Sequence, residues 1–174
     1  MPPTDPPPRD LGTFDALRNI VAQLRGPQGC PWDRQQSHSS LRGPLLQECY
    51  EVLEALDDSD PQQLCQELGD LMMNIMLLAQ IASEAGEFEL PDLFRTINTK
   101  LIHRHPHVYG SRQVNSIGEV LRNWDELKRE ESESPSSALD GVPRQLPALA
   151  RGQELQRRAA ASGFDWEHSE DILE

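Results

Sequence analysis

Residues 45–56 read LLQECYEVLEAL, and residues 66–76 read QELGDLMMNIM. Each stretch carries two carboxylates three positions apart beside a run of apolar residues. The four acids are Glu48 and Glu51 in the first stretch and Glu67 and Asp70 in the second. Helical residues turn by about 100° each, so positions three apart share a face. The short link DDSDP predicts that the two helices are antiparallel neighbours, which would converge the four acids beside a common core.

Four carboxylates in one small volume repel each other strongly unless cations are present. An all-oxygen donor set suits a hard cation such as Mg²⁺ or Mn²⁺, and the chain has no Glu-x-x-His pattern that would indicate a di-iron site. The competing interpretation is a solvated helix face, which is what a single E-x-x-E pair usually represents. Two pairs in matched phase strengthen the metal-site interpretation, and both interpretations remain open at this point.

The rest of the chain predicts helices and almost no strands. Apolar residues recur at helical spacing, and capping residues mark the ends of the segments. Helices are expected over Thr13–Arg25, from Pro44, over Pro61–Gly86 with Asp60 as N-cap, from Pro91, from Ser116, and near Pro147–Ala161. Residues 26–43 are predicted as a polar, turn-rich segment, and Pro106 is expected to end the helix before it. The predicted fold is an all-α bundle of about five main helices with a C-terminal helical extension.

Composition narrows the classes of function. The 174 residues include 29 acidic and 16 basic side chains, giving a net charge of −13, which disfavours binding to nucleic acid or an anionic membrane. No apolar run reaches membrane-spanning length and the N-terminus lacks a signal-peptide pattern, so a cytoplasmic protein is expected. Three scattered cysteines do not form a disulfide or zinc pattern, and Cys49 and Cys65 are interpreted as buried, reduced thiols.

Several longer motifs occur in one order along the chain. They are GCPWD (29–33), the two acid pairs, KLIHRHPHVYG (100–110), NWDELKREE (123–131) and GVPRQLPALARGQELQRRAAASGFDW (141–166). Together they resemble the MazG family of all-α nucleoside triphosphate pyrophosphohydrolases, over roughly residues 13–166.

The resemblance implies hydrolysis of nucleoside triphosphates, NTPs or dNTPs, to the monophosphate and pyrophosphate with Mg²⁺, or Mn²⁺, as cofactor, in a nucleotide-pool house-cleaning role. By position, Glu48, Glu51, Glu67 and Asp70 would be the catalytic metal ligands. Lys100, Arg104, Trp124 and Lys128 would contact the nucleotide, with Trp32 as a further candidate. A homodimer is expected, because the family assembles its sites from more than one subunit and residues 71–82 are apolar nearly all round.

Alternatives remain open at several of these positions. Lys100 and Arg104 also fit solvated helix charges, Trp124 also fits a core position, and Trp32 also fits a loop anchor. The alternating histidines 103, 105 and 107 are better explained as a polar turn than as a zinc site, because Pro106 interrupts regular geometry.

The motif order predicts four segments: a Pro-rich disordered N-terminus (1–12), a catalytic helical domain (13–131), a linker (132–141) and a C-terminal helix with an acidic tail (142–174). Gln47 stands where many relatives carry a further glutamate, and the chain is expected to be a single-module form. The tail acids are hypothesised to fold back towards Lys100 and Lys128 and restrain activity. A nucleotide-binding regulatory module with little turnover is the alternative function.

Overall fold

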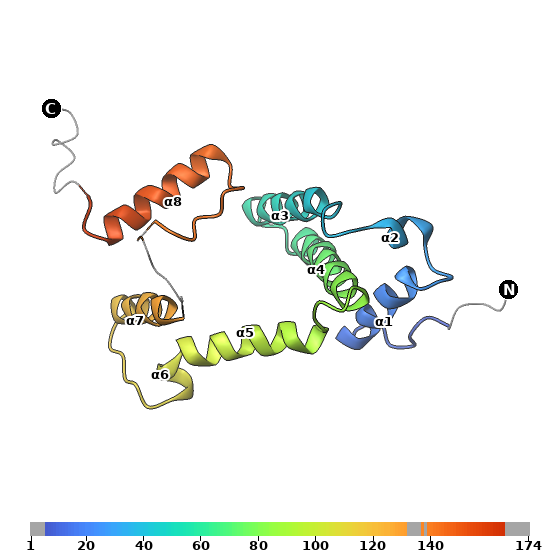
Figure 1. Cartoon of the computed structure of the whole chain (residues 1–174), viewed down its shortest axis with the longest axis horizontal. Coiled ribbons are helices and arrows are strands. Elements are labelled where there is room, and N and C mark those ends of the chain that lie inside the picture. The colour runs from blue at the N-terminus through green and yellow to red at the C-terminus, as the bar shows by residue number, and fades with distance from the viewer. Residues whose placement is uncertain (1–5, 132–136, 138, 166–174) are drawn as a thin grey trace. The chain divides into compact units, whose positions relative to one another are not determined.

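The computed structural model describes residues 6–131, 137 and 139–165. These residues form eight helices and no strand, so the prediction of an all-α chain is confirmed (Figure 1). The helices are α1 (Phe14–Arg25), α2 (Pro31–Gln35), α3 (Arg42–Asp57), α4 (Pro61–Glu84), α5 (Leu90–Arg104), α6 (Pro106–Tyr109), α7 (Ile117–Glu130) and α8 (Ala148–Ala161). None of the helices in the described ranges is long and apolar enough to cross a membrane.

The chain divides into two compact units, residues 1–99 and residues 100–174. The division falls within α5, whose first turns belong to unit 1 and whose last turn belongs to unit 2. The predicted boundaries at residues 13, 131 and 141 stay a prediction. The hypothesised tail contacts involve residues 166–174, which lie outside the described residues, as do residues 1–5 of the N-terminus and most of the 132–141 linker.

Unit 1 is built on a small apolar core between α1 and α4. Val21, Leu41, Met76 and Leu77 are buried together at its centre. Both helices start where their capping residues predict: the Thr13 hydroxyl accepts from the Ala16 amide, and the Asp60 carboxylate accepts from two amides in the first turn of α4. These caps set the position of the core-facing side chains along each helix axis.

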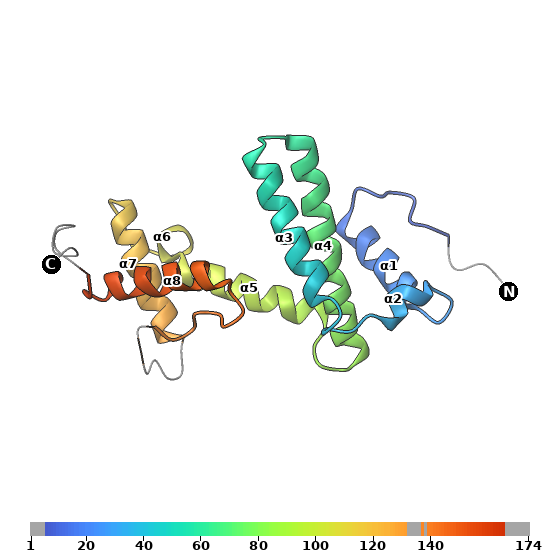
Figure 2. The same cartoon turned by 90° about the horizontal axis from the view of Figure 1, so that it is seen from above.

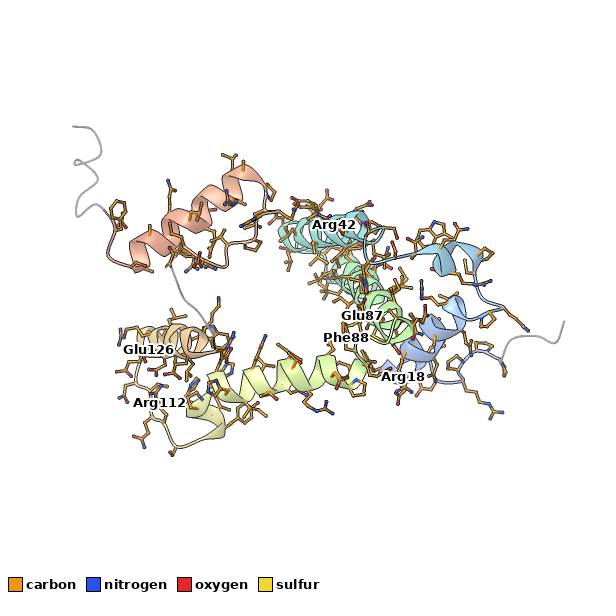
Figure 3. The ribbon with its side chains drawn as sticks, in the orientation of Figure 1. Arg18, Arg42, Glu87, Phe88, Arg112 and Glu126 are labelled. Atoms are coloured by element: carbon orange, nitrogen blue, oxygen red, sulfur yellow. The ribbon has the colours of Figure 1, made fainter. Side chains whose placement is uncertain are left out.

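Helices α3 and α4 pack against each other as an antiparallel hairpin, as the short link predicts (Figure 2). Residues 58–60 make the connection, and Ser59 takes a left-handed conformation with φ 54° to reverse the chain. Arg42, labelled in Figure 3, opens α3 two residues before the predicted start at Pro44. The proline is tolerated because the amides of the first helical turn lack intrahelical partners.

Two expectations about unit 1 are wrong. Cys49 and Cys65 are free but exposed, because each lies on the side of its helix that faces away from the core. The segment 26–43 contains the short helix α2, started by Pro31 at its first position, which its polar residues conceal. Buried residues on α3 are limited to Ala55, and its apolar stripe remains exposed at Leu46, Leu53 and Leu56.

Unit 2 joins the end of α5 to α6, α7 and α8. His105 leaves the helical conformation before Pro106, as predicted, but the chain re-forms one helical turn as α6. At the start of α7 the Ser116 hydroxyl accepts from the Glu119 amide, and the Glu119 carboxylate reaches back to the Asn115 amide. The predicted capping box is therefore present with its return bond shifted by one residue.

Candidate active site

The α3–α4 hairpin positions the four predicted acids. Glu48 and Glu51 lie one turn apart on α3, and Glu67 and Asp70 lie one turn apart on α4. Because the helices run antiparallel across a three-residue link, the middle of α3 faces the first half of α4. The short link and the matched spacing of the acid pairs, from which the sequence predicts that the acids lie close together, are therefore both present in the structure.

Three of the four acids form one compact group. Carboxylate oxygens of Glu48, Glu67 and Asp70 all lie within 4.8 Å of one another. Glu67 is the most buried of them, with 8% of its surface exposed. One turn further along α4, the buried Asn74 side chain donates to the Asp70 backbone carbonyl at 3.1 Å, which fixes this face of the helix.

Glu51 borders the group without joining it. Its carboxylate accepts a hydrogen bond from the Gln47 side chain at 2.9 Å, one turn earlier on α3. The residue that departs from the family pattern therefore engages the fourth acid directly.

The electrostatics of the group follow from crowding on a partly buried surface. Burial raises the pKa of Glu48, and the neighbouring charges of Glu51 and Asp70 raise it further. The pKa of Glu67 is raised by the same causes, burial first and then Glu51 and Asp70. Two carboxylates whose charged forms are disfavoured in this way gain stability from a bound cation.

The donor set fits a hard divalent cation. Three carboxylates supply only oxygen ligands, which Mg²⁺ and Mn²⁺ prefer, and their mutual distances allow one ion to contact all three. Among the described residues, the salt bridges do not place a lysine or arginine on any of these carboxylates. A cation could therefore supply the counter-charge of this surface.

Trp32 lies on α2, and its side chain is exposed. The position of α2 depends on Arg25 at the end of α1, whose side chain is only 6% exposed. One nitrogen, Nη1, donates to the backbone carbonyls of Asp33 and Gln36 at 2.5 and 3.2 Å. Nε and Nη2 bind the Glu84 carboxylate at 2.6–3.1 Å. Arg25 thus ties α1 and α4 to α2, the helix that carries Trp32.

Unit 2 brings two of the predicted nucleotide-contacting residues together. The Arg104 guanidinium carbon lies 5.5 Å from the centre of the Trp124 ring, and the His105 ring meets that tryptophan edge-on at 5.0 Å. Lys100 and Lys128 are exposed on α5 and α7. Among the described residues, the group that could hold a metal does not include His103, His105 or His107.

Comparison with known proteins shows which family this chain resembles. The sequence model of the MazG nucleotide pyrophosphohydrolase domain matches residues 36–109. A protein of Thermotoga maritima named nucleoside triphosphate pyrophosphohydrolase/pyrophosphatase MazG is 40% identical over 162 residues, which is 92% of this chain and 62% of that protein. Residues 36–109 of this chain form a MazG domain.

Two further MazG comparisons extend this result. The uncharacterized protein YabN of Bacillus subtilis is 45% identical over 145 residues, which is 83% of this chain and 30% of that protein. The crystal structure of a mazG-related protein from Thermotoga maritima aligns with a TM-score of 0.57 at 29% identity, over 66% of this chain and 98% of that one. The chain therefore spans less than two thirds of the length of the Thermotoga maritima MazG protein and of YabN.

The matched MazG segment contains all four acids, Lys100 and Arg104, whereas Trp32, Trp124 and Lys128 lie outside it. Sequence reasoning missed three contributors to these surfaces: Gln47 on Glu51, Arg25 beneath α2, and Glu131 on Arg104. Only Gln47, at i,i+4 from its partner, has a spacing that predicts its contact.

Sequence reasoning also missed a cleft of about 640 Å³ in unit 1, between α1, α4 and the start of α5. The centres of the Phe14 and Phe94 rings lie 5.3 Å apart in its wall. Met76 lines the cleft nine residues after Glu67, half a turn away, so the cleft and the acids occupy opposite faces of α4.

Proposed function

We propose that this chain hydrolyses nucleoside triphosphates, NTPs or dNTPs, to the monophosphate and pyrophosphate with Mg²⁺, or Mn²⁺ in its place. The observation that carries the proposal is the group of three carboxylates on the α3–α4 hairpin of a MazG domain. Displacement at a phosphate needs positioning and neutralisation of charge more than a covalent nucleophile. Oxygen ligands for a metal, together with basic side chains for the phosphates, provide that combination.

In this proposal Glu48, Glu67 and Asp70 bind the metal, and Glu51 completes the ligand set or orients it through Gln47. The metal, when bound, neutralises phosphate charge and lowers the pKa of a bound water. Arg104, Lys100 and Lys128 bind phosphate oxygens. Trp124 and Trp32 contact the nucleotide.

The assembly and cellular role are part of the same proposal. Exposed apolar side chains on α3 and α4, among them Leu46, Leu53, Leu68 and Met72, support a homodimer in which a second copy covers this face. Residues 13–131 would act as the catalytic module, in the cytoplasm, in house-cleaning of the nucleotide pool.

The decisive experiment measures pyrophosphate release from a panel of NTPs and dNTPs with Mg²⁺ or Mn²⁺. Wild type is compared with Glu67→Ala and with Asp57→Ala, a matched control that removes one exposed carboxylate from the end of α3. Metal-dependent release that is lost in Glu67→Ala and retained in Asp57→Ala supports the proposal. Absence of release from every nucleotide, with the fold intact, contradicts it.

One observation favours a second function. The Gln47 amide donates to Glu51, and the compact group holds three acids rather than four. A chain with this arrangement that binds nucleotide and metal but releases no pyrophosphate would be a nucleotide-binding regulator. Titration of Mn²⁺ and a non-hydrolysable triphosphate, run beside the release assay, separates the two functions.

A further inference from the structure

Glu131, the residue after α7, closes a charged contact with the last turn of α5 in unit 2. Its Oε1 accepts from Arg104 Nε at 3.2 Å, and its Oε2 accepts from Arg104 Nη2. His103 Nδ1 lies 3.1 Å from the same Oε1. The carboxylate therefore binds one edge of the guanidinium in the bidentate geometry typical of arginine–carboxylate pairs.

Trp124 constrains the same guanidinium from a different direction. Its ring centre lies 5.5 Å from the guanidinium carbon, within the range of a cation–π contact. The guanidinium is thus fixed at one edge by Glu131 and across one face by Trp124, and 17% of the Arg104 side chain remains exposed. The edge that carries Nη1 has no hydrogen-bond acceptor among the residues that the structure describes.

A long, flexible arginine normally loses rotamer entropy when it binds an anion. Here the folded chain has already immobilised it, and two of its three remaining N–H donors, one on Nη1 and one on Nη2, form a fixed pair along the edge that carries Nη1. That edge has the planar geometry that matches two oxygens of a phosphate.

We propose that Glu131 is a positioning residue for substrate: it holds Arg104 against Trp124 so that the Nη1 edge is aimed at a phosphate oxygen of the nucleotide. The proposal rests on the nucleotide-hydrolysing function proposed above. Glu131 itself does not touch the substrate.

The ionisation of the pair is consistent with this role. The Arg104 hydrogen bonds lower the pKa of Glu131 to about 2, so the carboxylate stays charged at any pH at which the chain would work. The opposite role, in which Glu131 competes with phosphate and must be displaced, predicts that removing it tightens binding. The two roles therefore give effects of opposite sign.

The test uses inorganic tripolyphosphate as the probe, because it carries the phosphate chain without a base. Its affinity for the Mg²⁺-loaded full chain is measured by calorimetry for wild type, Glu131→Gln and Glu131→Asp, and KM and kcat are measured with the best substrate of the panel. We expect Glu131→Gln to weaken tripolyphosphate binding roughly tenfold, as loss of an orienting outer partner does at other charged sites. KM should rise with kcat largely retained, and Glu131→Asp should restore part of the affinity.

Two further variants exclude a general structural effect. Glu154→Gln is the matched control, since Glu154 is a carboxylate of the same unit that binds two arginines and also has a pKa of about 2. It should leave tripolyphosphate affinity unchanged. Glu131→Gln introduced into an Arg104→Lys chain should have little additional effect, because Glu131 acts through Arg104 and the two substitutions are then non-additive.

Tighter binding in Glu131→Gln, or unchanged binding with an intact fold, overturns the positioning role while pyrophosphate release by wild type still supports the proposed function. Additive effects of the Glu131 and Arg104 substitutions overturn it as well. A wild-type chain that neither binds tripolyphosphate nor releases pyrophosphate overturns both proposals together.

Discussion

Replacement of Arg25 by alanine should destabilise unit 1 far more than loss of a surface arginine. The side chain is 6% exposed and makes hydrogen bonds to the Glu84 carboxylate and to the backbone carbonyls of Asp33 and Gln36. Truncation leaves those carbonyls without this donor and leaves Glu84 without its counter-charge.

The size of the effect follows from these contacts. A hydrogen bond that involves a charged group contributes ~1.5–3 kcal/mol, and breaking a buried ion pair costs ~3–5 kcal/mol. Glu84 keeps 39% of its side chain exposed, so solvent screening places the ion-pair share at the low end. We therefore expect Arg25→Ala to lower the free energy of unfolding by about 3 kcal/mol. Arg25→Lys should lose about half as much, because one ammonium cannot engage both partners.

Urea unfolding followed by far-UV circular dichroism measures the difference. Arg18→Ala is the control, since Arg18 makes an exposed i,i+3 pair with Asp15 that should contribute no more than about 0.5 kcal/mol. Arg25→Ala should also raise KM, because it weakens the support of α2 and Trp32 on that helix is proposed to contact the nucleotide. An Arg25→Ala chain that unfolds at the same urea concentration as Arg18→Ala would refute the assignment of Arg25 as the link between α1, α2 and α4.

Three other changes test separate parts of the structure. Glu67→Gln should stabilise the metal-free chain against urea and weaken Mn²⁺ binding in calorimetry, because it removes one of three crowded charges. A variant that is less stable than wild type and also binds Mn²⁺ more weakly would contradict the crowding. Glu131 and Glu154 each have a pKa of about 2 in the folded chain, below the usual 4.5, so their contribution to stability is complete above pH 4.5 and is lost as the pH falls towards 2. A chain with both replaced by glutamine should show a flatter acid-denaturation profile than wild type. Asp60→Ala removes the α4 N-cap and should lower the thermal midpoint by an amount that corresponds to about 1 kcal/mol, whereas Asp60→Asn should retain most of the stability.

Local signals explain what the sequence predicts well. Thr13 and Asp60 cap the amides of their own helices, so their effect is visible within a few residues of chain. The acid pairs are predictable for the same reason, because a single helical hairpin brings them together. Which three of the four acids form the compact group is not predictable, because helical spacing does not specify the rotamers of their side chains.

The sequence does not predict contacts between residues that are far apart in the chain. It also does not predict which face of a helix a neighbouring element covers. Glu131 lies 27 positions from Arg104, and Glu84 lies 59 positions from Arg25; neither separation corresponds to a helical period. Cys49 lies within an apolar helical pattern, yet that pattern alone does not say which side of α3 is covered. Hence Cys49 was placed in the core and is in fact exposed.

The hairpin that carries the acids has a consequence for how the site is made. Residues 58–60 join the two helices, so the carboxylates of the compact group are separated by little sequence and their meeting costs little loop-closure entropy. Contacts of this kind form early in folding, ahead of pairings such as Arg25 with Glu84. The carboxylate group can therefore assemble without the long-range contacts of unit 1, and a divalent cation that binds it, as proposed above, would stabilise the hairpin independently of those contacts.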